Sequence, residues 1–211
     1  MSKPKGLYIV FEGVIGSGKT VQSQRLVSKL QQEFPDRNVV WTREPGGSEI
    51  AGEIRRVVQG MLFTEDMNPI CEQYLYAASR AQTLRIIVEP VIKQGGIVVA
   101  DRSVFTSLAF QGFGRGLGIK TVLEVNKVAV GDIWPDLVVF LDLNLDAAMS
   151  RTKDKQGDKF ELMDKKFFAR VRQGYLEIAR KYKKTMKIVD GKGSIDEVAD
   201  RVWQVVSHTL K

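Results

Sequence analysis

The fold class is decided by residues 7–20, which read LYIVFEGVIGSGKT. The run 7–11 is continuously apolar and rich in β-formers, as is typical of a strand that is buried on both faces. Residues 13–20 fit the pattern G-x-x-x-x-G-K-[S/T], and apolar residues at helical spacing continue from Val21 to Leu30. A glycine-rich turn between a buried strand and a helix start predicts a phosphate-binding loop.

Each residue type in this loop has a physical task in binding a nucleoside triphosphate. The glycines let backbone N–H groups turn toward phosphate oxygens, and the helix start adds a favourable partial positive charge. Lys19 can reach the outer phosphates, and the hydroxyl of Thr20 can ligate magnesium. We therefore predict an ATP-binding set made of Gly13, Val14, Ile15, Gly16, Ser17, Gly18, Lys19 and Thr20.

Four further apolar runs predict strands at 39–42, 97–100, 137–141 and 186–190. Helical stretches separate them, which favours right-handed crossovers and a parallel sheet covered on both faces. We expect one α/β domain over residues 1–211. One helix, starting near Ser48, has an apolar stripe made of Ile50, Ile54, Val57 and Val58. A longer helix runs from about Pro69 to Lys93, and its residues expected to face inward are Ile70, Tyr74, Ala77, Ala81, Leu84 and Val88.

Composition excludes several classes of protein. The chain has 211 residues, of which 44% are apolar and 27% charged, as in ordinary globular domains. No run approaches the roughly 18 uncharged apolar residues that a membrane span needs, and we expect a cytoplasmic protein without membrane contact. The lone Cys71 has no internal disulfide partner, and we expect it to be a small buried apolar residue.

The net charge of +7 is concentrated in one segment. Residues 151–187 carry 13 Lys and Arg against 5 Asp and Glu, whereas the rest of the chain has 19 basic and 20 acidic residues. Such a segment can be a nucleic-acid footprint, a clamp for a small polyphosphate, or a solvated helix face. Charge alone does not choose among these interpretations.

Asp101 follows the apolar run 97–100, at the carboxyl end of a predicted strand. A carboxylate in that place suits the second acidic position of a P-loop enzyme, which holds magnesium directly or through water. Its alternative role is to cap the helix that begins near Ser103. We predict a metal site made of Thr20 and Asp101.

Four motifs, in order along the chain, resemble one enzyme family. Residues 11–20 are followed by TREPGG at 42–47, by YAASRAQ at 76–82, and by Asp101-Arg102 with SLAFQG at 107–112. Together they resemble thymidylate kinase, and the second motif is characteristic of the bacterial enzymes. The resemblance extends over nearly the whole chain.

The resemblance implies transfer of the γ-phosphate of ATP to dTMP, giving dTDP and ADP with Mg²⁺, in the synthesis of deoxynucleotides. It implies a P-loop nucleoside monophosphate kinase core: a five-stranded parallel sheet flanked by helices, with a small lid at about 151–164. It also implies a homodimer with no nucleic-acid partner. A lid closing over ATP would bring Arg151, Lys153, Lys155 and Lys159 near the phosphates.

The resemblance also assigns roles to residues. The catalytic set is Lys19, Arg102, Arg151, Lys153 and Lys155, and the dTMP-binding set is Glu12, Arg43, Pro45, Tyr76, Arg80, Arg102, Ser107 and Gln111. Tyr76 and Arg80 are four residues apart and share a helix face, where a ring can stack on thymine and a guanidinium can contact base or phosphate. The alternative for Tyr76 is a core aromatic.

The chain departs from the family at the acceptor site. Many members have an acidic residue, associated with the sugar 3'-hydroxyl, where this chain has Ile15. The tyrosine that usually follows Asp-Arg is Ser103 here, the acidic or polar position after it is Phe105, and the tyrosine before the glutamine is Phe110. Lysines stand in the lid where bacterial members often have arginines. Three alternatives to a dTMP kinase therefore stay open: a kinase for another or modified nucleoside monophosphate, a nucleotide-binding protein with reduced transferase activity, and a basic single-strand binder.

Overall fold

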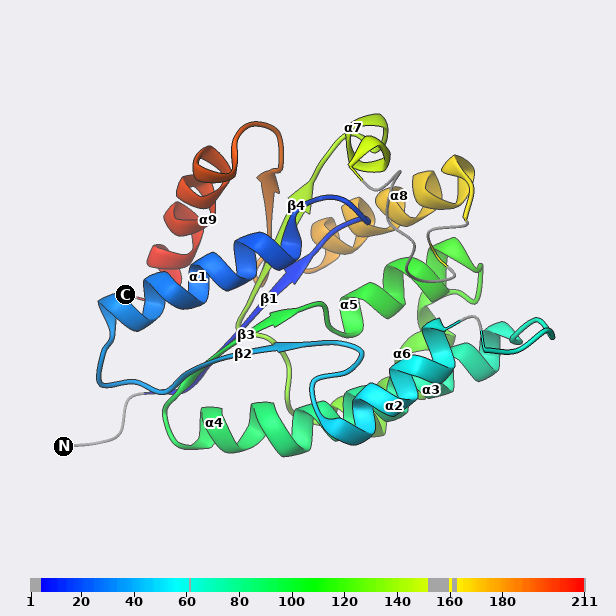
Figure 1. Ribbon diagram of the computed structural model, residues 1–211, viewed down its shortest axis with the longest axis horizontal. Coiled ribbons are helices and arrows are strands. Elements are labelled where there is room, and N and C mark those ends of the chain that lie inside the picture. The colour runs from blue at the N-terminus through cyan, green and yellow to red at the C-terminus, as the bar shows by residue number, and fades with distance from the viewer. Residues whose placement is uncertain (1–4, 61, 152–159, 161–162, 211) are drawn as a thin grey trace.

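The computed structural model describes residues 5–60, 62–151, 160 and 163–210. Its strands are β1 (Leu7–Glu12), β2 (Val39–Arg43), β3 (Ile97–Asp101), β4 (Leu137–Asp142) and β5 (Met186–Asp190). They form one five-stranded sheet in the order β2-β3-β1-β4-β5 (Figure 1). Every pairing is parallel, with Ile9 of β1 opposite Val99 of β3 and Leu137 of β4. The α/β class and the five-stranded parallel sheet predicted from the sequence are confirmed.

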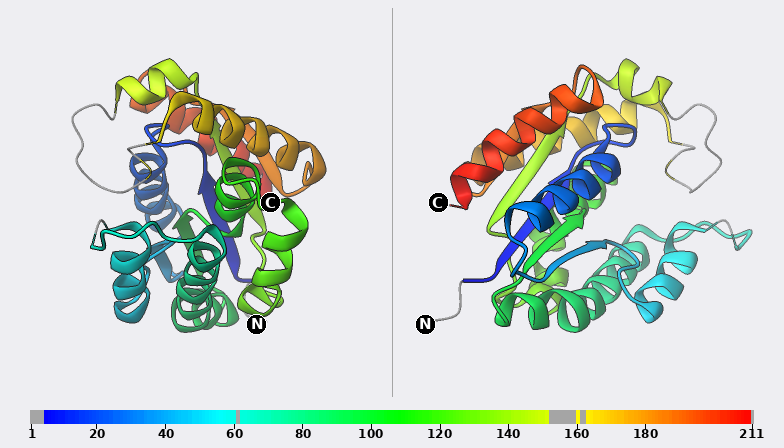
Figure 2. Two further views of the ribbon diagram at one scale, coloured as in Figure 1. Left: turned by 90° about the vertical axis from the view of Figure 1, so that its right-hand side faces the viewer. Right: turned by 60° about the vertical axis from the view of Figure 1, so that its left-hand side comes forward.

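Helices cover both faces of the sheet. One face is covered by α1 (Lys19–Glu33) and α9 (Ile195–Thr209), which lie side by side in Figure 2. The helical segments over the other face or beside it are α2 (Glu49–Gln59), α3 (Pro69–Thr83), η1 (Leu84–Val88), α4 (Glu89–Lys93), α5 (Val104–Ser107), η2 (Leu108–Gly114), α6 (Ile119–Val130), α7 (Leu145–Ser150) and α8 (Lys165–Lys181). The two π-helical segments, η1 and η2, each continue a preceding α-helix.

Alternate residues of the strands belong to two apolar cores, one on each face of the sheet. Ile9, Val99 and Val139 pack with Leu30 of α1 and Val202 of α9, whereas neighbouring strand residues such as Val10 and Phe140 face the helices opposite. The central strands are apolar throughout because both faces are buried. The edge strands β2 and β5 are only partly buried, so residues 39–42 form a half-buried strand and not the fully buried one that the sequence suggested.

Polar residues fix several helix starts. Ser48 caps α2, Asn68 caps α3, and Ser194 caps α9 in a reciprocal capping box with Glu197. Asp164 caps α8. In the part of the chain that the structure describes, no helix is long and apolar enough to cross a membrane.

Two residues expected to face inward, Ile70 and Tyr74 of α3, are exposed, Tyr74 by 59%. Ile50 and Val57 of the apolar stripe on α2 are exposed as well. Cys71, expected to be buried, is also exposed. The physical reason lies in the face that α3 turns inward, which is formed mainly by Gln73, Tyr76, Arg80 and Thr83. This face is largely polar, so apolarity did not identify it.

Candidate active site

The phosphate-binding loop joins β1 to α1 at the carboxyl edge of the sheet. Gly18 has φ +91°, in the left-handed region that favours glycine, and it directly precedes the first residue of α1. A Cβ on Gly13 would lie 2.7 Å from the carbonyl oxygen of Leu141. The loop therefore needs glycine at one position for its backbone angle and at the other for its close approach to β4.

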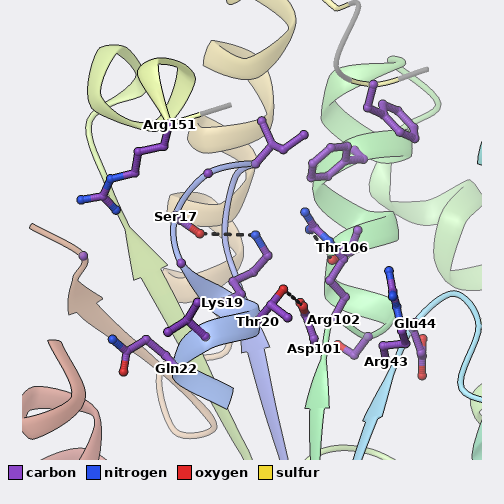
Figure 3. Close-up of a pocket in the computed structure, with 18 of the residues that line it drawn as sticks. Ser17, Lys19, Thr20, Gln22, Arg43, Glu44, Asp101, Arg102, Thr106 and Arg151 are labelled. Carbon is purple, nitrogen blue, oxygen red and sulfur yellow. Dashed lines mark hydrogen bonds between the residues drawn. The ribbon is translucent and has the colours of Figure 1, made fainter. Parts of the chain in front are cut away.

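Lys19 lies inside this loop. Its Nζ donates hydrogen bonds to the carbonyl oxygen of Val14 at 2.7 Å and to Oγ of Ser17 at 3.3 Å (Figure 3). The side chain of Lys19 is buried. Burial lowers the pKa of Lys19 to about 7, helped by the positive charge of Arg102 and opposed by Asp101 and Glu12.

Thr20 and Asp101 meet across the loop. The Thr20 hydroxyl donates to Oδ2 of Asp101 at 2.5 Å (Figure 3). Oδ1 of Asp101 is buried and makes no hydrogen bond within the described residues. An orphaned carboxylate oxygen beside a hydroxyl fits a magnesium ion whose other ligands are phosphate oxygens and water. Asp101 does not take the capping role, because Ser103 caps α5.

Arg102 is held in an unusual backbone conformation. Its φ of +81° is rare for a residue with a side chain. Nη1 donates to the carbonyl oxygen of Gly13 and to Oγ1 of Thr106, each at 3.2 Å, and the guanidinium lies over the ring of Phe110. These contacts aim the cation along the loop that follows β1.

Glu12 lies beneath the loop and does not line the cavity described below. Its carboxylate accepts hydrogen bonds from Ser103 Oγ at 2.7 Å, Tyr175 Oη at 2.8 Å and Thr106, through both the hydroxyl and the backbone N–H. Burial raises the pKa of Glu12, while the charge of Arg102 and these hydrogen bonds act in the opposite direction. Glu12 is thus placed to support Arg102 and the loop from below.

A cavity of about 700 Å³ opens along the carboxyl ends of the strands. The predicted residues that line it are Ile15, Gly16, Ser17, Gly18, Lys19, Thr20, Arg43, Pro45, Tyr76, Arg80, Asp101, Arg102, Gln111 and Arg151. Four other predicted residues, Glu12, Gly13, Val14 and Ser107, are buried and do not line it. Crevices at this edge of open α/β sheets are the usual ligand sites.

Several other residues that line the cavity were not predicted from the sequence. They include Gln22, Glu44, Arg55, Gln59, Thr106, Phe160 and residues of the turn from Gly191 to Ile195. Two of them carried a signal in the sequence: Glu44 lies within the TREPGG motif at 42–47, and Ser194 of the turn starts a capping box. The others come from helix faces or loops whose direction is set by tertiary packing.

The guanidinium of Arg80 makes its contacts mainly with other residues of the protein. It forms an ion pair with Glu44 at 2.7 Å, with both side chains 3% exposed, and its guanidinium also donates to Asn126, the carbonyl of Ser103 and the hydroxyl of Ser107. Burial raises the pKa of Glu44, and Arg80 lowers it. Ser107, expected to face the pocket, instead accepts a hydrogen bond from Arg80 behind the cavity wall.

Aromatic side chains form part of the same wall. Tyr76 is 5% exposed and its hydroxyl accepts a hydrogen bond from Nε2 of Gln59 at 3.2 Å. Phe110 and Phe160 line the cavity with their rings 5.3 Å apart. Phe105 instead packs in the core against Trp134 and Tyr182.

Of the predicted lid cations, Arg151 is exposed and points along one side of the cavity (Figure 3). Lys153, Lys155 and Lys159 lie outside the described residues.

The loop, the paired threonine and aspartate, and the cavity at the carboxyl edge of a parallel sheet define an α/β P-loop nucleotide-binding protein. The family model for thymidylate kinase matches residues 11–202. The thymidylate kinase of Syntrophotalea carbinolica is 38% identical, over 96% of this chain and 96% of its own. That of Oenococcus oeni is also 38% identical, over 98% of each chain. A crystal structure of thymidylate kinase from Ehrlichia chaffeensis superposes with a TM-score of 0.77 at 28% identity, covering 96% of this chain and 99% of that one. The chain belongs to the thymidylate kinase family.

Proposed function

We propose that the protein transfers the γ-phosphate of ATP to dTMP, giving dTDP and ADP, in a magnesium-dependent step of dTTP synthesis. The observation that carries this proposal is one cavity in which the phosphate-binding loop has Gln22 on one side and Arg43 on the other (Figure 3). Gln22 contacts the Gly191–Ile195 turn by donating to the carbonyl oxygen of Ile195. Tyr76 and Gln111 belong to the Arg43 end, because Arg80, one turn after Tyr76, pairs with Glu44, and Gln111 donates to Glu72, one turn before Tyr76. Two nucleotides entering from opposite ends would bring their phosphates together at the loop.

The acceptor nucleotide belongs at the end with Tyr76. There an aromatic ring and the amide of Gln111 can contact a base, while Arg43 and Arg102 can neutralise its phosphate. Arg80 supports this end through its ion pair with Glu44 and through its hydrogen bond to the hydroxyl of Ser107. Glu12 supports Arg102 and α5 without lining the cavity.

Catalysis of phosphoryl transfer rests on positioning and charge neutralisation. Lys19 would bind the transferring group, and Arg102, Arg151, Lys153 and Lys155 would add positive charge around it. Thr20 and Asp101 would hold magnesium, which supplies further positive charge to the phosphates when it is bound. The residues 151–164 would form the lid of a single kinase domain spanning residues 1–211.

We further propose a homodimer acting in the cytoplasm, where ATP and dTMP are available. Exposed apolar side chains on neighbouring helices favour self-association: Ile50 on α2, Ile70 and Tyr74 on α3, and Val128, which is 86% exposed, on α6. Sedimentation of the protein at micromolar concentration tests this, because a monomeric mass contradicts it.

A second candidate is a kinase whose preferred acceptor is another or a modified nucleoside monophosphate. The observation in its favour is Ile15, an apolar side chain on the cavity wall where family members often have a carboxylate. A nucleotide-binding protein with little transferase activity is the third possibility.

One assay separates these functions. Turnover is measured with ATP, Mg²⁺ and each of dTMP, dUMP, dCMP, dAMP and dGMP, with the Lys19→Met variant as the control for contaminating kinases. We expect dTMP to have the highest kcat/KM. A higher value for another monophosphate supports the second candidate, and binding of ATP without turnover of any acceptor supports the third.

A further inference from the structure

The side-chain amide of Gln111 uses one of its two polar atoms in a hydrogen bond, and the other has no partner among the described residues. Its Nε2 donates to Oε1 of Glu72 at 2.8 Å. Its Oε1 is buried and finds no hydrogen-bond partner among the residues that are described, and the residue is 1% exposed and lines the cavity. A buried acceptor without a partner is costly, so this oxygen is suited to a donor supplied by a ligand.

Glu72 determines which edge is free. It is fully buried on α3, one turn before Tyr76, and it does not line the cavity. An ionised carboxylate can only accept hydrogen bonds, so the edge of the amide that faces it must be the NH₂ group. Arg115 donates to both oxygens of the carboxylate, from Nη2 to Oε2 of Glu72 at 3.0 Å and from Nε to Oε1 at 3.4 Å.

Arg115 is itself fixed, because its guanidinium lies over the rings of Phe160 and Phe167 at 5.5 and 5.7 Å. The arrangement is therefore a chain from the aromatic wall through Arg115 and Glu72 to the amide of Gln111. Rotating this amide by half a turn would point its carbonyl oxygen at the carboxylate of Glu72. That orientation is unfavourable because both groups are hydrogen-bond acceptors.

We propose that Glu72 is a specificity-determining positioning residue, which locks the Gln111 amide so that its carbonyl oxygen faces the acceptor base. This inference rests on the proposed function in placing a pyrimidine nucleotide at this end of the cavity. An acceptor oxygen pairs with the ring N3–H of thymine or uracil and opposes the N3 lone pair of cytosine. The lock thus selects bases by their hydrogen-bonding edge and not by their methyl group.

The test compares binding of three nucleotides by calorimetry. dTMP and 5-methyl-dCMP share the sugar, phosphate and methyl group, and differ only at ring position 3 and at position 4. dTMP and dUMP share the N3–H and differ in the methyl group. In Glu72→Gln the neighbour can donate or accept, and the amide of Gln111 becomes free to turn.

We expect Glu72→Gln to lower the preference for dTMP over 5-methyl-dCMP by about tenfold or more, which is the scale of one hydrogen bond. The preference for dTMP over dUMP should stay within about twofold, whereas a general loosening of the pocket would lower both. Glu53→Gln, which removes a carboxylate on the exposed face of α2, is the matched control and should change neither ratio. An unchanged preference against 5-methyl-dCMP in folded Glu72→Gln overturns the proposal.

A double variant covers the case in which Glu72→Gln does not fold. Glu72→Gln with Gln111→Glu exchanges the donor and the acceptor, keeps the total charge, and again leaves an acceptor oxygen toward the base. We expect it to retain the preference for dTMP over 5-methyl-dCMP, and loss of that preference in the folded double variant contradicts the lock. The proposed function is judged separately, since it fails if the unmodified protein neither binds nor phosphorylates dTMP.

Discussion

The hydroxyl of Tyr175 donates a hydrogen bond of 2.8 Å to Oε2 of Glu12, although the two residues are 163 positions apart. Tyr175 lies on α8, and Glu12 ends β1 directly before the phosphate-binding loop. The same hydroxyl lies 3.1 Å from Oγ1 of Thr106 and 3.5 Å from Nη1 of Arg102. Helix α8, which follows the proposed lid, thereby contacts Glu12 at the base of the phosphate-binding loop and the guanidinium of Arg102.

Removing this hydroxyl should destabilise the protein in a pH-dependent way. Burial raises the pKa of Glu12 above its unfolded value, so its contribution to stability is present below the unfolded pKa and is lost as pH rises through the folded pKa. The Tyr175 hydrogen bond lowers that pKa by favouring the ionised form. Tyr175→Phe should therefore lower the free energy of unfolding by about 1–3 kcal/mol at pH 8, and by less at pH 5.

Urea unfolding at the two pH values measures this effect. Tyr182→Phe is the matched control, because Tyr182 follows α8 and its ring packs against Phe105. We expect the control to show a smaller and pH-independent change. If Tyr175→Phe lowers the free energy of unfolding equally at pH 5 and pH 8, the hydroxyl does not act on the ionised form of Glu12.

Lys19 should take up a proton when ATP binds. Its pKa of about 7 is depressed by burial, so the stability it contributes is present above the unfolded pKa and is lost as pH falls through about 7. Phosphate oxygens beside the amine favour the charged form and raise the pKa. At pH 8, binding of a non-hydrolysable ATP analogue should therefore take up close to one proton, and at pH 6 much less.

Calorimetry in buffers of different ionisation enthalpy gives the number of protons. Lys19→Met keeps much of the buried side chain and should lose this uptake, together with about 10²–10³-fold in turnover. Lys29→Met, an exposed position on the same helix, should leave both unchanged. Proton uptake at pH 8 that survives in Lys19→Met would assign it to another group.

The sequence identified the sheet and the loop because their signals are local. Apolar runs predicted all five strands, and the loop pattern placed Lys19 and Thr20 on the cavity wall. The inward face of α3 was not predictable from apolarity, since it carries Gln73 and Arg80, two polar side chains that are buried. The Glu44 partner of Arg80 is 36 residues away, and no local pattern indicates such a pair.

Sequence patterns also do not predict which way a side chain points. Glu12 and Ser107 belong to motifs of the site, but the strand pleat and helix rotation turn them behind the cavity wall. Gln59 and Arg55 line the cavity from α2 because that helix packs against α3, which only the tertiary structure shows.

Asp101→Asn should weaken the binding of the magnesium ion that turnover requires, with little loss of stability. The amide oxygen of asparagine can still accept from Thr20, while the negative charge beside the buried Oδ1 is lost. We expect the Mg²⁺ concentration for half-maximal turnover to rise about tenfold or more. Asp190→Asn makes the same chemical change at the carboxyl end of the edge strand β5 and serves as control. Equal Mg²⁺ dependence in both variants would remove Asp101 from the metal site.

Ile15 is the departure from the family that lies nearest the chemistry. It is half-buried on the cavity wall, within the loop and against the aromatic core. An isoleucine cannot accept a hydrogen bond from a sugar 3'-hydroxyl, so selectivity at the sugar should be low. Base contacts near Tyr76 and the cations around the phosphate remain, and dTMP should still bind.

We therefore predict that the protein treats dTMP and its 3'-deoxy analogue nearly alike. In Ile15→Asp the carboxylate can accept from the 3'-hydroxyl, and kcat/KM for dTMP should exceed that for the analogue by about tenfold, the scale of a hydrogen bond to a charged group. Val21→Asp is the matched control, because it places the same charge elsewhere on the cavity wall and should create no such preference. The measurement is kcat/KM for both nucleotides in the three proteins. A preference for dTMP of about 100-fold in the unmodified chain would exceed one neutral hydrogen bond and would show that another group reads the sugar.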